Sequence, residues 1–151
     1  MAEFIHNDSK TVQLKKVIFS IYEHFLNYGA DVSYPLACPE HGAFTGYKVG
    51  YALDNYVSLI PCIITLFIPE DAKRSSAYTT KCRCDKAKVL NITTFGGEKR
   101  VAASSWYSPD FVYEVNKEIS VPDFDEDRWH ECAPGIHFFM SKKEALDYWR
   151  G

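Results

Sequence analysis

Apolar residues recur at helical spacing near the start of the chain. Val17, Ile21 and Phe25 lie on one face of a helix over residues 9–28, and lysines occupy its other faces. Gly29 supplies the left-handed residue that ends many helices. We therefore predict an amphipathic helix over residues 9–28. Its apolar stripe needs a partner surface, which is either the domain core or a second subunit.

The middle of the chain changes to the pattern of strands. Residues 44–53 are rich in aromatic and β-branched side chains, which predicts a first strand. Residues 56–68 predict one longer strand or two, and Pro61 indicates a sheet edge or a bulge because proline cannot donate to a ladder.

The next segment has the composition of a hairpin. A strand from Lys81 or later to residue 94 is followed by Gly96-Gly97, which suits a tight turn. Residues 101–105 are then expected to be the return strand. Residues 111–115 alternate apolar and polar positions and predict one more half-buried strand.

Near the end of the chain a strand is followed by a capped helix. Residues 136–140 form a short apolar run after Gly135, which allows the backbone to turn. Ser141 is a good N-cap, and Glu144 stands three residues later at the spacing of a capping box. We therefore predict a helix that begins after Ser141.

Together these elements predict an α+β fold. We expect one domain over residues 1–151, with an antiparallel or mixed sheet of about five to seven strands. The amphipathic helix over residues 9–28 precedes an α+β core over residues 44–151, which ends in the C-terminal helix.

Composition narrows the classes of function. The 151 residues are 46% hydrophobic, which excludes a disordered chain. A net charge of −3 and a pI near 5.9 argue against general nucleic-acid binding. No apolar run is long enough to span a bilayer, and the first residues lack the features of a signal peptide, so we expect a cytoplasmic protein without a membrane partner. In that compartment the five cysteines are expected to be reduced.

Five separated motifs resemble a known family. They are ITLFIPEDAKRSS, KCRCDKAKVLNI, FVYEVNKEI, FDEDRWHECAPGIHFF and EALDY. In this order they resemble an uncharacterised domain family that occurs in small viral and bacterial proteins and attached to pentapeptide-repeat proteins. Asn116 departs from the family pattern, which more often has glycine there, and this indicates a less tight turn. The resemblance implies a shared fold and no particular activity. For a viral member it implies the host cytoplasm.

Basic and aromatic residues recur along the predicted strands. The cations are Lys48, Arg74, Lys81 and Arg83. Arginine suits phosphate or carboxylate, and the aromatic faces of residues such as Tyr51, Trp106, Phe111 and Tyr113 can stack a base. Lys81, Arg83 and Tyr113 also match positions typical of the family that the motifs resemble. We predict that Lys48, Arg74, Lys81, Arg83, Tyr113 and His137 bind a small anionic, nucleotide-like ligand. The alternative is that these cations simply face water.

A second resemblance suggests an enzyme. GIHFFMSKKEALDY is loosely similar to the strand-helix segment of ADP-ribosyltransferases, and His41-Gly42 resembles the start of their nicotinamide pocket. This resemblance implies His41, His137 and Tyr148 as catalytic residues acting on NAD or a related dinucleotide. In that family a catalytic glutamate lies on a later strand, whereas this sequence ends at Gly151. We therefore favour no catalytic residues.

Cysteine and histidine residues offer the atoms of a zinc site without its usual spacing. The candidates are Cys38 with His41, Cys82 with Cys84, and Cys132 with His130 or His137. Their separations differ from paired zinc motifs, so we expect no metal and no cofactor. Cys132 and His137 as a nucleophile and its base are likewise disfavoured, because no oxyanion motif accompanies them.

The leading hypothesis is thus a non-enzymatic protein that binds a small anionic, nucleotide-like molecule. A viral member of this kind would sequester a signalling nucleotide or block a host protein. One alternative is the ADP-ribosyltransferase-like enzyme. The other is a protein-interaction module that self-associates into a homo-oligomer through the helix over residues 9–28.

Overall fold

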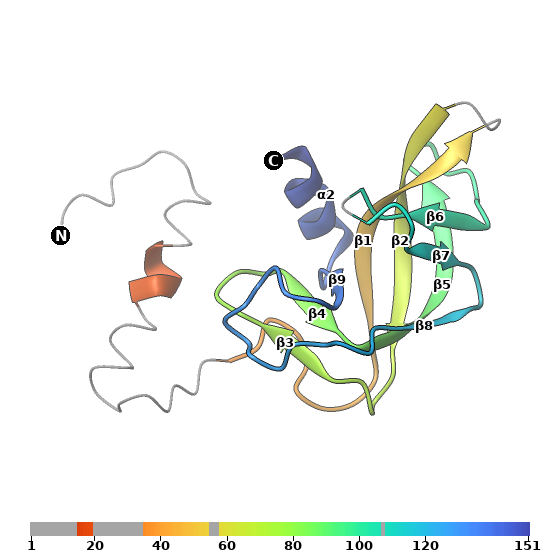
Figure 1. The fold of residues 1–151 in the computed structure, drawn as a ribbon. Coiled ribbons are helices and arrows are strands. Elements are labelled where there is room, and N and C mark those ends of the chain that lie inside the picture. Colours follow the sequence, from red (N-terminus) through yellow and green to blue (C-terminus); the bar gives the residue numbers. More distant parts are fainter. Residues whose placement is uncertain (1–14, 20–34, 55–57, 107) are drawn as a thin grey trace.

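The structure is a computed structural model that describes residues 15–19, 35–54, 58–106 and 108–151 (Figure 1). Residues 15–19 are helical, in agreement with the predicted amphipathic helix, and the rest of that helix lies outside the described residues. Within the described ranges no helix is long and apolar enough to cross a membrane.

The strands of the described chain form two antiparallel sheets. The larger has six strands in the order β7-β6-β1-β2-β5-β8. Its strands are β1 (Phe44–Asp54), β2 (Ser58–Ile68), β5 (Lys86–Thr94), β6 (Ala102–Ser104), β7 (Val112–Glu114) and β8 (Glu118–Ser120). The smaller has the order β3-β4-β9, from β3 (Arg74–Ser76), β4 (Cys82–Cys84) and β9 (Ile136–Phe138). With the terminal helix α2 (Lys142–Arg150), this confirms the predicted α+β class.

The core lies on one face of β2, where every second residue is buried. Cys62, Ile64, Leu66 and Ile68 have no exposed surface, as the two-residue period of a strand requires. Glycines on the neighbouring β1 allow close packing against this face. A Cβ atom on Gly46 would lie 2.6 Å from Cδ2 of Phe138, which leaves no room for a side chain.

Two local predictions need correction because the chain changes sheets. The segment predicted as one strand from Lys81 divides into β4 and β5, which pair in different sheets. Gly97 does turn with φ at 93°, and the amide of Thr94 donates to the carbonyl of Glu98 at 2.8 Å. The return is nevertheless short, because β6 pairs with β1 and β7 instead of β5.

Pro61 sits where β2 has a neighbour on one side. It pairs with Tyr51 of β1, whereas pairing with β5 begins at Cys62. The missing N–H of proline therefore costs no ladder bond to β5. The irregularity in the pairing of β2 with β5 lies elsewhere: Thr65 pairs with Asn91 and Leu66 with Val89, so the extra residue, Leu90, is on β5.

Helix α2 begins as the capping box predicts. The backbone of Ser141 is extended, and its Oγ accepts a hydrogen bond from the amide of Glu144 at 3.1 Å. The same hydroxyl donates to Oε1 of Glu144 at 2.8 Å. The helix lies beside β1, and its own residue Ala145 is buried (Figure 1).

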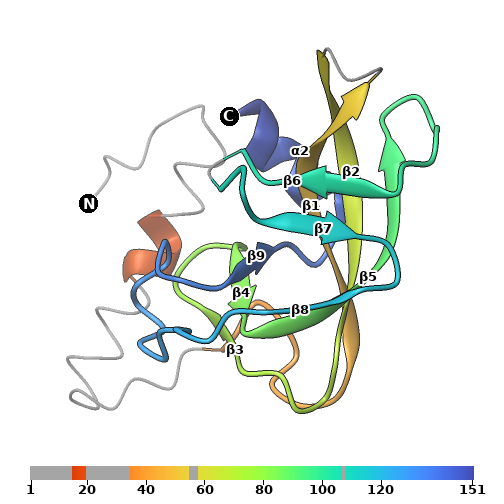
Figure 2. The same ribbon diagram turned by 45° about the vertical axis from the view of Figure 1, so that its right-hand side comes forward.

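One edge of β1 has two different neighbours. Tyr47 exchanges backbone hydrogen bonds of 2.8 and 2.7 Å with Phe139, just after β9. Tyr51, farther along, pairs with Ser104 of β6. Figure 2 shows β9 and β6 at different heights along β1. Residues 48–50 lie between these two pairings, and this is where the molecule is hollowed.

Candidate functional site

A cleft of about 890 Å³ opens between β9, β6 and helix α2. Its walls come from β1, β7, β9 and α2, and from the loops that follow β6 and precede β9. Two lysines line it, and no aspartate or glutamate is among its described lining residues. We call it the lysine cleft. Five of the predicted ligand-binding or catalytic residues line it, namely Lys48, Lys81, Tyr113, His137 and Tyr148, and so do the aromatic residues Tyr51, Trp106 and Phe111.

Lys48 lies at the inner end of the lysine cleft. It is 8% exposed, and its Nζ donates a hydrogen bond to the hydroxyl of Tyr113 at 2.8 Å. No carboxylate forms an ion pair with it in the part of the chain that the structure describes. Burial, and to a smaller extent the Lys81 ammonium, lower the pKa of Lys48 to about 8. Burial also raises the pKa of the Tyr113 hydroxyl, which keeps its proton at neutral pH.

Lys81 lies nearer the mouth of the cleft. Its Nζ donates to the hydroxyl of Tyr148 on α2 at 3.1 Å and lies 5.0 Å from the centre of the same ring. Cys132 Sγ is 3.9 Å from this ammonium group. These contacts hold the Lys81 charge against the wall formed by α2 without neutralising it.

His137 is the third nitrogen-bearing side chain of the cleft. Burial lowers its pKa to about 4, and the charges of Lys81 and Lys48 act in the same direction. The ring is therefore neutral at neutral pH. Its Nε2 lies 3.2 Å from the backbone carbonyl of Glu131, and because a carbonyl only accepts, Nε2 carries the proton.

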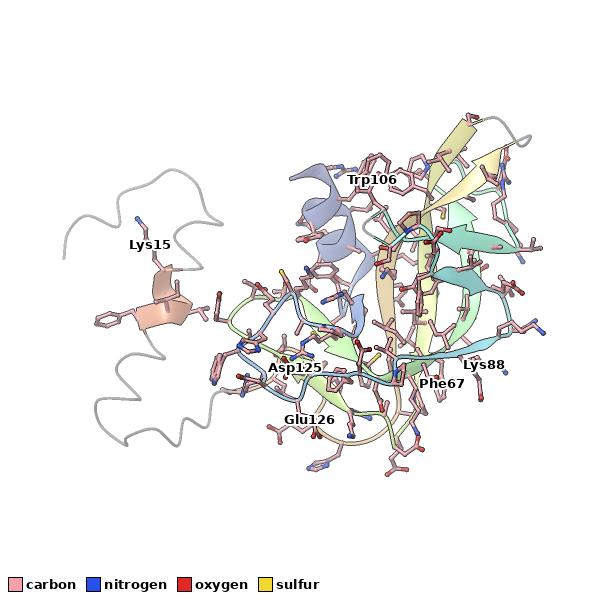
Figure 3. The ribbon with its side chains drawn as sticks, in the orientation of Figure 1. Lys15, Phe67, Lys88, Trp106, Asp125 and Glu126 are labelled. Carbon is pink, nitrogen blue, oxygen red and sulfur yellow. The ribbon has the colours of Figure 1, made fainter. Side chains whose placement is uncertain are left out.

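Aromatic rings form the outer wall. Trp106 is 63% exposed, and its ring centre lies 5.3 Å from that of Tyr51. The indole N–H of Trp149 donates to the Tyr51 hydroxyl at 2.7 Å, which joins α2 to β1. Figure 3 shows Trp106 near α2, on a different side of the molecule from Lys88. An exposed flat ring beside a cationic cleft is suited to stack on a planar ligand.

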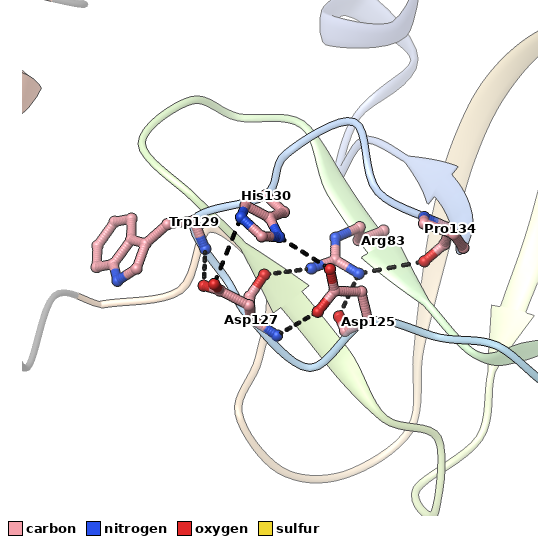
Figure 4. A network of polar contacts seen from close by, with 6 residues as sticks. All are labelled: Arg83, Asp125, Asp127, Trp129, His130 and Pro134. Carbon is pink, nitrogen blue, oxygen red and sulfur yellow. Dashed lines mark hydrogen bonds and ion pairs between the residues drawn. The ribbon is translucent and has the colours of Figure 1, made fainter.

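Arg83, in contrast, lies outside the lysine cleft, and its hydrogen bonds stabilise the fold (Figure 4). Its guanidinium is buried and donates to the backbone carbonyls of Asp125, Asp127 and Pro134. The carboxylate of Asp125 is also within 2.9 Å of Nδ1 of His130, which raises the pKa of that histidine. Arg83 therefore fixes the loop that carries part of the cleft wall, and it is not aimed at a ligand.

Arg74 also has a structural role, because its guanidinium group is hydrogen-bonded to backbone carbonyls. All five of its N–H donors meet carbonyl oxygens, at distances of 2.6 to 3.2 Å. The acceptors are the carbonyls of Pro39, Gly42, Pro69, Glu70 and Ala72. His41 is exposed in the loop before β1 and does not line the cleft. The predicted set of cations is thus divided between one shared cleft and two structural arginines.

The cysteines are all free, and four of the five are buried. Cys132 is the exposed one and lies at the rim of the lysine cleft. Among the residues that the structure describes, no three His, Cys, Asp or Glu side chains are grouped so that they could hold a metal ion. The pairs considered for zinc from their spacing are therefore not brought together into a site within these residues.

Sequence reasoning did not assign Ala145 and Trp149 to the site. Both lie on the face of α2 that lines the cleft. Their helical spacing with Tyr148 indicated one apolar face, yet spacing alone does not tell a core-facing side from a cleft-facing side. In the structure Trp149 is 39% exposed at the cleft, whereas Ala145 is buried in its wall.

Comparison with known proteins identifies the family to which the chain belongs. No curated protein and no solved structure matches the chain significantly. A family model matches residues 34–145, which include Lys48, Lys81, Tyr113 and His137. The chain therefore belongs to the family of unknown function DUF5758.

Proposed function

We propose that this protein is a non-enzymatic binding protein for a small anionic, nucleotide-like ligand, which occupies the lysine cleft. The observation that carries the proposal is the charge of this cleft. Lys48 and Lys81 face it, and no aspartate or glutamate is among its described lining residues, in a chain whose net charge is −3. The Glu131 carboxyl outside this lining interacts with Lys81, so Lys48 is the more isolated charge. Burying an ammonium group without a counter-ion has a high free-energy cost. An anion that binds from solution would offset part of this cost and would therefore bind favourably.

The remaining walls suit the organic part of such a ligand. A volume of about 890 Å³ lies within the range of roughly 300 to 1,000 Å³ that is usual for small-molecule sites. Trp106 and Tyr51 offer aromatic faces at the mouth, and the Tyr148 hydroxyl and the His137 ring add polar atoms to the walls. A planar base on the rings with its phosphate on the lysines satisfies both halves of this surface.

The ligand class can be narrowed further. Nucleoside triphosphates are usually held by several cations or by Mg²⁺ that carboxylates retain. The described cleft offers two lysines and no carboxylate. We therefore favour a ligand with one phosphate or carboxylate group, such as a nucleoside monophosphate or a cyclic nucleotide.

The enzyme alternative finds less support. The catalytic set carried over from ADP-ribosyltransferases needs His41 near His137 and Tyr148, but His41 does not line their cleft. The interaction module depends on the helix over residues 9–28, most of which lies outside the described residues. A viral, host-cytoplasmic protein that sequesters a signalling nucleotide would use the lysine cleft directly, and we retain this as the biological setting of the proposal.

A thermal-shift panel tests this function. Nucleoside monophosphates, cyclic nucleotides, uncharged nucleosides and inorganic phosphate are each added to the wild-type protein. At a ligand concentration of about 100 Kd we expect stabilisation of about 2.7 kcal/mol, or a Tm increase of about 5 to 10 °C. K48M and K81M should lose most of this increase relative to their own ligand-free Tm.

The matched control is K88M, because Lys88 is an exposed lysine on β5 outside the cleft. It should respond to ligand as the wild type does. If no anionic member of the panel raises Tm, or if K48M and K81M respond as strongly as K88M, the proposed function is wrong.

A further inference from the structure

Lys48 combines three features that are rarely found together in one lysine. Its side chain is buried, it faces a cleft open to small molecules, and it has no carboxylate partner among the described residues. Anion binding uses the charged ammonium form of this group. It assigns no role to the uncharged amine form, which has a free lone pair. With a pKa of about 8, about one Lys48 in ten is uncharged at pH 7, compared with fewer than about one in a thousand for an ordinary lysine.

Burial and the nearby Lys81 charge favour the uncharged form of Lys48. Lys81 from the segment before β4 adds a second positive charge, and His137 of β9 is neutral. Tyr113 of β7 and Cys84 of β4 are buried, and burial raises the pKa of each, so both stay protonated at neutral pH. No neighbour among these supplies the negative charge that would fix Lys48 as an ammonium ion. Buried lysines beside another cation are the kind that act as amine nucleophiles.

We propose that Nζ of Lys48 is a nucleophile that forms a reversible imine with an aldehyde or ketone carrying an anionic group. This rests on the proposed function in one respect, because the anionic group would be held by Lys81 in the same cleft. The different roles of Lys81 and Lys48 follow from their positions in the cleft. Lys81 lies near the mouth and is paired with the Tyr148 hydroxyl at 3.1 Å, whereas Lys48 lies at the inner end.

The hydroxyl of Tyr113 is placed to move the protons of this step, since it lies 2.8 Å from Nζ of Lys48. The lone pair of the uncharged amine attacks the carbonyl carbon, and the carbonyl π electrons move to oxygen. That oxygen takes the proton of the Tyr113 hydroxyl, and the cationic nitrogen returns a proton to the Tyr113 oxygen. The carbinolamine then expels its hydroxyl group with the remaining nitrogen proton as water. One amine and one carbonyl compound give one imine and one water, and nothing is oxidised or reduced.

Reductive trapping tests the proposal with pyridoxal 5′-phosphate as the probe, because it joins an aldehyde to a single phosphate. The full-length protein is incubated with the probe, reduced with sodium borohydride, digested and mapped by mass spectrometry. We expect the secondary amine on Lys48 at a yield about tenfold or more above that of exposed Lys88, as its larger uncharged fraction implies. K81M should need a higher probe concentration for the same yield, and K88M should match the wild type.

The peptide map of the wild-type protein decides the matter without any variant. Adducts on exposed lysines with Lys48 unmodified would overturn the proposal. If nucleoside monophosphates raise Tm while Lys48 stays unmodified, the imine proposal fails and the binding function stands. If Lys48 is trapped and no anionic ligand of the panel raises Tm, the amine chemistry stands and the proposed nucleotide function fails.

Discussion

Replacing Lys48 with methionine should stabilise the ligand-free protein, because the lysine is held in the fold at a cost. Methionine has a similar length and no charge. A pKa lowered from 10.5 to about 8 corresponds to about 3 kcal/mol of unfavourable free energy for the charged form in the folded state. The substitution removes this cost and also removes the hydrogen bond to Tyr113. An unpaired buried hydroxyl costs about 1 to 3 kcal/mol, so the net gain for K48M is between about 0 and 2 kcal/mol at neutral pH.

The pH dependence gives the sign of the effect. The folded-state pKa of Lys48 is below its unfolded-state value, so the unfolded chain binds more protons between pH 8 and 10.5. Wild-type stability should rise through this window as the buried ammonium loses its proton. K48M lacks this contribution. The advantage of K48M over the wild type should therefore fall by about 2 kcal/mol between pH 7 and pH 9.5.

Urea denaturation at these two pH values measures both quantities. K48M/Y113F removes both partners of the hydrogen bond and should recover the full gain of about 3 kcal/mol at neutral pH. K88M is the control and should change stability by less than about 0.5 kcal/mol at either pH. If K48M and the wild type differ by the same amount at both pH values, Lys48 is not a costly buried cation and the reasoning is wrong.

Three other predictions concern the frame of the cleft. Gly50→Ala should lower stability by about 1 to 3 kcal/mol in urea denaturation, because its Cβ would lie 2.9 Å from the backbone oxygen of Ser104; an unchanged midpoint would contradict this packing. Arg83→Met should lower it by about 2 to 4 kcal/mol by leaving backbone carbonyls unpaired, and Arg83→Lys should not restore it, since lysine lacks the forked donors. A thiol reagent should modify Cys132 alone in the native protein and all five cysteines in denaturant; rapid native modification of a second thiol would refute the buried environments.

The sequence predicted those parts of the fold that depend on near neighbours. Ser141 and Glu144 stand three residues apart, so their capping contact could be inferred directly from spacing. The half-buried strand predicted from the alternation over residues 111–115 is β7, in which Tyr113 is buried between exposed Val112 and Glu114. The hairpin after Gly96-Gly97 was predicted only in part, because which strand β6 pairs with depends on the whole sheet and not on the turn.

The cleft depends on contacts that local patterns do not encode. Lys48 meets Tyr113 across 65 residues, and Lys81 meets Tyr148 across 67. A cation on a strand looks the same in sequence whether it faces a ligand or a carbonyl. Arg74 and Arg83 illustrate this, since their acceptors include carbonyls 35 and 51 residues away. The recurrence of basic and aromatic residues along the strands indicated an anion site. Only the fold separates the two lysines that line the cleft from the two arginines that bind backbone carbonyls.

Isothermal titration calorimetry tests the central claim most directly, namely that Lys48 and Lys81 together hold an anion in the cleft. The titrant is the panel compound that raises Tm most, and its uncharged counterpart is titrated alongside. We expect binding to the wild type and K88M with equal Kd, and a Kd about tenfold or more weaker for K48M and for K81M, which is about 1.4 kcal/mol per lysine. Equal affinity in all four proteins, or equal affinity for the charged and uncharged compounds, would contradict it.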